Sequence, residues 1–268
     1  MFEPLRQLFR PRQEAPRPSL PPGERAYVIG DIHGRLDLFD ELIHAIERDD
    51  MEAPPPVRTT VVLLGDLVDR GPESAQVVAR AREWKTRRPL RILAGNHEEM
   101  FLEAFEDTAI LRHFLKHGGR ETLFSYGVSK KVFDESSIHE LQTLMHRLVP
   151  RRDREFIETF EDYIELGDYL FVHAGIRPEI ELADQERHDM LWIREPFLRH
   201  TNPHSHVVVH GHTISDEVDE RTNRIGIDTG AFRSGMLTAL VLEGTGRRYI
   251  QAVEETGMIA IHKRDSDA

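Results

Sequence analysis

The sequence contains no cysteine among its 268 residues. This absence excludes a disulfide framework, a zinc site built on thiolates and a cysteine nucleophile. Long apolar runs are also missing, because none approaches the roughly 18 residues that a membrane helix needs. The first ten residues, MFEPLRQLFR, lack the apolar core of a secretory signal. We therefore expect a protein that resides in the cytoplasm and does not associate with a membrane.

Positive charge is scarce relative to negative charge, and the formal net charge at pH 7 is −12. Nucleic-acid affinity depends mostly on Lys and Arg, so nucleic acid is not an expected partner. A local positive pocket remains compatible with this balance. The hydrophobic share of 39% and the charged share of 31% are those of an ordinary globular protein. A chain of this length accommodates one large α/β domain, with or without an insertion.

The two ends of the chain are predicted to lie outside that domain. Residues 1–24 are rich in proline and arginine and predict an extended arm, in which Phe2, Leu5 and Phe9 could dock through one short turn. The domain itself is expected to span residues 25–255. Residues 256–268 are predicted to be a C-terminal tail. The sequence leaves the role of the arm open.

Three strand–turn–helix units follow one another in the first part of the domain. Each begins with a short apolar run that is typical of a buried strand, and each run ends in a glycine followed by Asp, Asn or His. This alternation predicts a largely parallel sheet, whose carboxyl edge is where reactive groups are presented. The three predicted strands are residues 25–30, 61–64 and 90–94.

Residues 99–165 break this rhythm and predict a helical cap insertion with apolar stripes that form a core of its own. Strands are then expected at residues 169–172 and 207–209, each again ending in histidine and glycine. Residues 225–228, 236–242 and 249–253 alternate in the manner of antiparallel strands.

Potential metal ligands therefore follow five predicted strands. Carboxylates and imidazoles with one amide oxygen suit manganese, iron or zinc better than calcium or magnesium. Asp66 follows the most apolar strand and is a candidate ligand shared by two ions. Ions about 3.5–4 Å apart allow a bridging hydroxide to attack phosphorus in line. A single Asp-Gly turn would carry no such meaning, but the five segments together do: Asp31 with His33, Asp66, Asn96 with His97, His173, and His212.

Five motifs at these positions resemble, in order, those of the calcineurin-like metallophosphoesterases. The GDxVDRG form resembles the phosphoprotein phosphatase branch, and the segments LWIRE and IDTGAFRSG are similar to its bacterial and phage members. The resemblance implies a metallophosphoesterase-type αββα sandwich, with two mixed β-sheets flanked by helices, and a helical insertion. The motifs are GDIHG (30–34), GDLVDRG (65–71), GNHE (95–98), HAG (173–175) and GH (211–212).

The resemblance also implies roles for individual residues. It places Asp31, His33 and Asp66 on a first divalent metal ion, and Asp66, Asn96, His173 and His212 on a second. Manganese is the expected metal, with iron or zinc as alternatives. His97 would be the general acid and Asp69 would hold it. The substrate phosphate would be bound by Arg70, Asn96 and Arg194.

The implied activity is hydrolysis of phosphoserine and phosphothreonine in proteins by direct attack of a metal-bridging hydroxide. One alternative is a hydrolase of dinucleoside polyphosphates such as diadenosine tetraphosphate. That neighbouring family typically lacks the aspartate of VDRG and has GNHD, so Asp69 and Glu98 favour the first activity. A broad-specificity phosphatase and a catalytically inactive binding scaffold are further alternatives. The expected partner is a phosphorylated protein or small phosphoester, and the oligomeric state stays open.

Several neighbouring residues receive other interpretations. Glu98 is expected to bind backbone amides at the start of the following helix. Asp228 is interpreted as part of a structural turn. A contribution of His210 or Arg233 to the site is left open, and the remaining histidines are expected at the surface or in packing.

Overall fold

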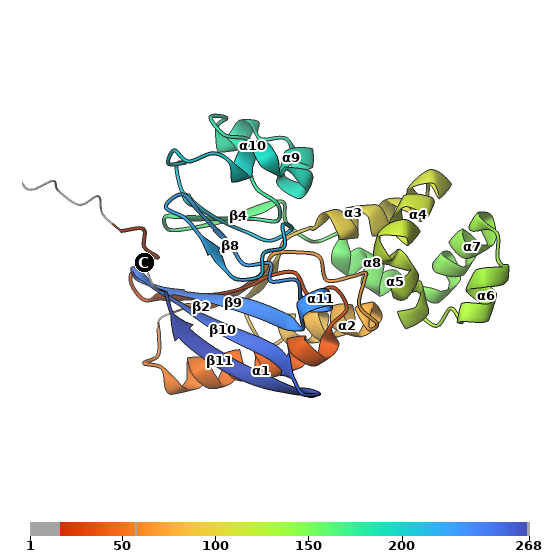
Figure 1. Ribbon diagram of the computed structural model, residues 1–268, viewed down its shortest axis with the longest axis horizontal. Coiled ribbons are helices and arrows are strands. Elements are labelled where there is room, and N and C mark those ends of the chain that lie inside the picture. Colours follow the sequence, from red (N-terminus) through yellow and green to blue (C-terminus); the bar gives the residue numbers. More distant parts are fainter. Residues whose placement is uncertain (1–16, 57, 267–268) are drawn as a thin grey trace, which may run out of the picture.

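Two β-sheets packed face to face form the framework of the protein (Figure 1). A computed structural model describes residues 17–56 and 58–266. In the first sheet, β1 (Glu24–Ile29), β2 (Arg58–Leu63) and β3 (Leu90–Ile92) are parallel neighbours. On the other side of β1 the antiparallel strands are β9 (Met236–Glu243), β10 (Gly246–Glu255) and β11 (Met258–Asp265), giving the order β11-β10-β9-β1-β2-β3.

The second sheet is shorter and also mixed. Its strands are β4 (Tyr163–Leu166), β5 (Tyr169–Val172), β6 (Val207–His210), β8 (Arg224–Gly226) and β7 (Asp219–Glu220), in that spatial order. The three central strands, β5, β6 and β8, are parallel. The edge strands β4 and β7 are antiparallel to their neighbours. Residues 225–228 were expected to form an antiparallel strand. The strand β8 is antiparallel to β7, as expected, but parallel to β6.

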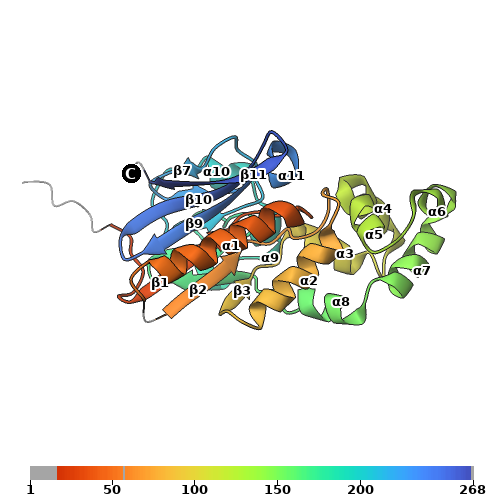
Figure 2. The same ribbon diagram turned by 90° about the horizontal axis from the view of Figure 1, so that it is seen from below.

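Side chains alternate between the two faces of each strand, which explains the layers. On β1, Ala26 and Val28 pack between the sheets, against Phe171 and Val209 from the second sheet. Tyr27 on the opposite face packs under helices α1 (Leu36–Glu52) and α2 (Ser74–Lys85). Figure 2 shows α1 and α2 lying across this outer face of the first sheet. Because both faces of the strands are buried, their apolar runs are nearly continuous.

Helices also cover the outer face of the second sheet. Val172 and Val208 point there and pack against Phe197 and Met190. These come from α9 (Arg187–Trp192) and α10 (Glu195–Leu198), at the top of Figure 1. The expected αββα sandwich is confirmed. Two further short helices are η2 (Leu182–Asp184), which precedes α9, and α11 (Ala231–Ser234), which lies beside β9 of the first sheet.

The helical insertion forms a lobe beyond one end of the sheets (Figure 1). Its core is continuous with that under α1 and α2, since Phe101, Phe114 and Met145 belong to the same buried cluster as Phe39. The expected separate core is therefore wrong. The helices of the lobe are α3 (Asn96–Glu103), α4 (Thr108–Phe114), the π-helical segment η1 (Leu115–Gly119), α5 (Arg120–Ser125), α6 (Lys130–Glu135), α7 (Ile138–Leu148) and α8 (Arg151–Ile157).

The domain boundaries differ from the expected ones. Residues 163–165, assigned to the insertion, lie in strand β4. Residues 256–268 were expected to be a tail, but Met258–Asp265 pair with β10 along eight positions as the edge strand β11. An edge strand exposes most of its side chains, so the apolar alternation that marks a half-buried strand is weak there.

At the other end, Leu20 is buried and Ser19 donates its amide to Asp168, so part of residues 1–24 belongs to the body. The remainder of the predicted arm, with Phe2, Leu5 and Phe9, lies outside the described residues, as do residues 267–268. Within the described ranges, no helix is both long and apolar enough to span a bilayer.

Candidate functional site

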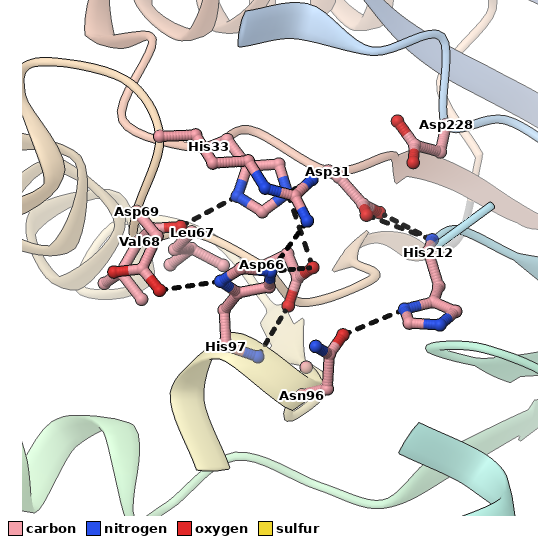
Figure 3. A network of polar contacts seen from close by, with 12 residues as sticks. Asp31, His33, Asp66, Leu67, Val68, Asp69, Asn96, His97, His212 and Asp228 are labelled. Atoms are coloured by element: carbon pink, nitrogen blue, oxygen red, sulfur yellow. Dashed lines mark hydrogen bonds and ion pairs between the residues drawn. The ribbon is translucent and has the colours of Figure 1, made fainter. Parts of the chain in front are cut away.

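The predicted ligands meet where strands of both sheets end (Figure 3). Asp31 and His33 follow β1, Asp66 follows β2, and His173 and His212 follow β5 and β6. Asn96 and His97 begin helix α3 directly after β3. All seven of these side chains are buried, from completely for His33 to 8% exposed for His212. The structure thus brings together segments separated by up to 181 residues.

The backbone at this edge is strained. Among the described residues, seven that are not glycine have a positive φ, and five of them belong to the predicted site. L-amino acids with a side chain pay an energy cost in this conformation, which persists only where the surroundings hold it. Such clustering is typical of functional sites. The five are His33, Asp66, Asp69, Arg70 and His212.

The two carboxylate oxygens of Asp66 face two different groups of candidate ligands. Oδ2 lies 3.4 Å from Nε2 of His33 and 3.9 Å from Nε2 of His97. Oδ1 lies 3.5 Å from Nε2 of His173. The ligand atoms of Asp66, His33 and His97 lie within 4.8 Å of one another, and so do those of Asp66, His173 and His212. This arrangement fits a carboxylate that bridges two ions.

Asn96 completes the second group. Its Oδ1 lies 3.0 Å from Nε2 of His173 and 2.8 Å from Nδ1 of His212. Nδ1 of His173 lies 2.7 Å from the carbonyl oxygen of Leu64, to which it can donate, leaving the lone pair of Nε2 for an ion. His33 is held in the same way, with Nδ1 at 2.8 Å from the carbonyl oxygen of Val68.

Asp31 is arranged differently from the other predicted ligands of the first ion. Its carboxylate accepts the amide N–H of His212 at 3.0 and 3.2 Å, and it does not belong to the group of His33 and Asp66, where His97 lies instead. Asp228 lies beside it. Burial, Asp228 and Asp66 together raise the pKa of Asp31, and burial raises the pKa of Asp228 to about 6. The turn interpretation of Asp228 is confirmed by its bond from the amide of Gly230 at 2.9 Å.

Buried carboxylates and neutral imidazoles are the form that divalent ions require. Burial lowers the pKa of His33 and of His173, and it lowers that of His212 to about 2. Nε2 of His212 is buried and has no hydrogen-bond partner among the described residues. Burial would raise the pKa of Asp66, but the histidines around it, His173 first, lower it instead. The donor set therefore fits two ions of the manganese, iron or zinc type.

His97 and Asp69 form a close buried pair. Nδ1 of His97 lies 2.6 Å from Oδ2 of Asp69, and both side chains are 1% exposed or less. Burial lowers the pKa of His97, but the carboxylates of Asp66 and Asp69 outweigh this effect and raise it above the usual value. A raised pKa and a fixed ring suit a proton donor.

The partly exposed Arg70 lies at the mouth of the site, against His33 and His97 of the first group. Its guanidinium lies 2.8 Å from Nε2 of His33 and 2.9 Å from Nε2 of His97, and 4.8 Å from the ring centroid of Phe232. Arg70 is partly exposed, whereas the ligands behind it are buried. A cation held at this depth is placed to bind an anion that approaches the centre.

The other predicted residues lie at different distances from the centre. Arg194 is exposed, its side chain has no hydrogen-bond or ion-pair partner among the described residues, and its charge contributes to the low pKa of His212. Arg233 is 61% exposed and faces Asp216 at 4.0 Å. His210 is buried against the ring of Phe197 and belongs to neither ligand group. Arg194 and His210 each interact electrostatically with one candidate ligand, His212 and His173 respectively.

Glu98 binds backbone amides, as expected, but from two loops rather than one. Oε2 accepts the N–H groups of Asp66 and Gly95 at 2.8 and 2.9 Å, and Oε1 accepts that of Leu67 at 2.8 Å. Gly95 permits this approach, because a Cβ there would lie 2.7 Å from Oε2 of Glu98 and closer still to Oδ1 of Asp66. Glu98 therefore fixes the backbone that carries Asp66.

We expect Glu98→Gln to lower the free energy of unfolding by about 1–3 kcal/mol, because the amide NH₂ would face N–H groups and leave a buried donor without an acceptor. Chemical denaturation of the metal-free protein measures this without a contribution from lost ions. The control is Glu103→Gln, on the exposed side of the same helix. Equal stability of the two variants would contradict the role of Glu98.

Sequence reasoning missed two contacts from the insertion. Thr122 in α5 bonds to Asp69, and the carbonyl of Gly118 in η1 accepts the amide of Arg70. No local signal marks these residues, which lie about 50 positions after their partners.

Known proteins resemble this chain over most of its length. The family model of calcineurin-like phosphoesterases matches residues 24–232. Serine/threonine-protein phosphatase 2 of Escherichia coli strain K12 is 28% identical over 221 residues, or 79% of this chain and 90% of that protein. Bis(5'-nucleosyl)-tetraphosphatase PrpE of Anoxybacillus flavithermus is 25% identical over 236 residues, or 80% and 88%. A crystal structure described as a candidate diadenosine tetraphosphatase shares the fold, with a TM-score of 0.57 at 17% identity, covering 94% of this chain and 100% of that chain.

Proposed function

Because this chain belongs to the calcineurin-like phosphoesterase family, we propose that it is a two-metal protein phosphatase that hydrolyses phosphoserine and phosphothreonine. Asp66 would bridge the two ions, with Asp31 and His33 on one and Asn96, His173 and His212 on the other. When bound, the ions would supply an activated water and bind the phosphate oxygens. Manganese is the metal that we propose, with iron or zinc as alternatives.

The residues around the ligands would bind and orient the phosphate. Arg70 lies above both His33 and His97, so its guanidinium can hold phosphate oxygens over the ligand groups. Arg194 is unpaired among the described residues and close enough to influence His212. Asn96 would add its amide to the same anion. These groups make a positive mouth on an acidic protein, where electrostatic stabilisation of the transition state is strongest.

The observation that carries the proposal is the buried contact between His97 and Asp69. Serine and threonine alkoxides are poor leaving groups, so their departure needs a positioned proton donor. Asp69 would hold the ring of His97 and favour its protonated form, and Nε2 of that ring faces the mouth beside Arg70. The leaving group of a phosphate anhydride is a weakly basic anion, so its departure needs such a donor much less.

A second candidate is hydrolysis of dinucleoside polyphosphates, which is the activity named for the relative from Anoxybacillus flavithermus. The two candidates share the metal centre and differ in the leaving group. A pair such as His97 and Asp69 favours the protein phosphatase.

A matched assay distinguishes the two candidates. We expect the manganese-loaded protein to hydrolyse a phosphoserine peptide with a kcat/KM at least about tenfold higher than that for diadenosine tetraphosphate, because the proton donor accelerates only the first reaction appreciably. The reverse order would establish the second candidate. If neither substrate nor an aryl phosphate turned over with manganese, the protein would be a binding scaffold rather than a phosphatase.

A further inference from the structure

The turn after β2 carries two consecutive residues in a strained backbone conformation. Asp69 has a φ of 75° and Arg70 a φ of 67°, in the left-handed region that side chains disfavour. These are the residues that hold His97 and that would bind phosphate. A turn of this kind keeps its shape only if other groups bind it, so its amide partners indicate what holds it.

Both strained residues donate their amide N–H to the helical insertion. The N–H of Arg70 donates to the carbonyl oxygen of Gly118 at 3.1 Å. The N–H of Asp69 lies 2.9 Å from Oγ1 of Thr122, and it shares that bond with Oγ of Ser74 at 2.9 Å. The insertion therefore touches the turn at two successive peptide groups.

Thr122 also binds the carboxylate of Asp69. Its hydroxyl donates to Oδ1 at 2.6 Å, while Oδ2 accepts from His97 at 2.6 Å. Each oxygen of the buried Asp69 carboxylate thus has one donor: Oδ1 has Thr122 of the insertion, and Oδ2 has His97. With Oδ1 fixed, the carboxylate plane cannot rotate freely, and Oδ2 stays aimed at Nδ1 of His97.

Gly118 makes a second close approach. Its φ is 112°, and a Cβ at this position would lie 2.7 Å from both the amide nitrogen and Cγ of Arg70. A side chain at Gly118 would have to displace Arg70, whose guanidinium lies between His33 and His97.

We propose that the helical insertion positions the turn of Asp69 and Arg70. Thr122 is a positioning residue for the Asp69–His97 pair, and Gly118 is a positioning residue for Arg70. This inference rests on the proposed role of His97 as proton donor. The insertion then supports both protonation of the leaving group and binding of phosphate, in addition to any role in substrate choice. Displacing α5 and η1 would disable both functions at once.

The first test replaces Thr122 by valine, which keeps the shape and removes the hydroxyl. We expect hydrolysis of a phosphoserine peptide to slow about tenfold or more, because the donor loses its alignment, whereas p-nitrophenyl phosphate, with a good leaving group, changes less than about threefold. Thr122→Ser restores the hydroxyl and should return peptide turnover to within about twofold of the original protein.

The matched control is Ser125→Ala, in the same helix. The Ser125 hydroxyl joins α5 to the amide of Ala75 at 3.0 Å and does not touch Asp69. We expect its effect to be small and equal on both substrates. If Thr122→Val slowed both substrates equally, or neither, with an unchanged metal content, Thr122 would have only a packing role and the proposal would be overturned.

The second test compares Gly118→Ala with Gly127→Ala. Both glycines have a positive φ, but a Cβ at Gly127 meets no atom within 4 Å, so the two variants share the backbone strain and differ in the clash with Arg70. We expect calorimetry on the manganese-loaded protein to show inorganic phosphate binding at least about tenfold more weakly to Gly118→Ala, and within about twofold of the original for Gly127→Ala. Equal affinities of the two variants for phosphate would refute the positioning of Arg70 by Gly118.

The proposed function and this inference fail in different ways. If His97→Ala did not discriminate between the phosphoserine peptide and p-nitrophenyl phosphate, the proton-donor role itself would be wrong. If His97→Ala discriminated and Thr122→Val did not, the donor role would stand and the positioning by the insertion would be wrong.

Discussion

Replacing Asp66 by asparagine should leave a folded protein that binds divalent ions far more weakly and hydrolyses phosphoesters about 10³-fold more slowly or worse. Its two carboxylate oxygens face different ligand groups, Oδ2 toward His33 and Oδ1 toward His173. An amide offers one oxygen and an NH₂ group that cannot bind a cation, so one group loses its shared ligand. Bound ions supply several kcal/mol of transition-state stabilisation, at about 1.4 kcal/mol per factor of ten.

Metal content by elemental analysis, manganese affinity by calorimetry and kcat/KM for p-nitrophenyl phosphate measure these effects. Circular dichroism establishes that the variant is folded. The control is Asp153→Asn, which removes a buried carboxylate of α8 from its ion pair with Arg82 of α2, away from the ligand groups. A variant Asp66→Asn that kept two ions per chain would contradict the bridging arrangement.

His97→Ala is expected to slow hydrolysis of a phosphoserine peptide about 10²–10⁴-fold, the usual contribution of a general acid. Hydrolysis of p-nitrophenyl phosphate should fall by less than about tenfold, because p-nitrophenolate leaves without protonation. The physical reason is the position of the ring, which is held by Asp69 at 2.6 Å on one side and faces Arg70 at 2.9 Å on the other.

The pair of substrates separates loss of the proton donor from general damage to the centre. His97 also lies near Asp66, at 3.9 Å, so a variant that had lost an ion would be slow on both substrates. Metal content is therefore measured alongside the kinetics. His139→Ala, an exposed histidine of the insertion, is the control. Equal losses on both substrates would remove His97 from the acid role.

Local patterns in the sequence predicted the central strands of both sheets and the candidate ligands that follow them. The runs at 61–64 and 169–172 are apolar on both faces because both faces are buried. Such a run can be recognised from a few consecutive residues of the sequence. The role of Glu98 could also be predicted, since a glutamate at the third position of a helix commonly binds the backbone N–H groups that precede it. The edge strand β11 was not, because its side chains are mostly exposed and carry no burial pattern.

What the sequence by itself determined is the set of candidate donors and their placement at strand ends, because a strand's carboxyl end fixes where the next residues lie. The tertiary structure decided which oxygen of Asp66 faces which histidines, that Asp31 turns toward the amide of His212, and that Thr122 and Gly118 hold the turn of Asp69 and Arg70. Such contacts depend on the packing of segments far apart in the chain, and no local periodicity encodes them.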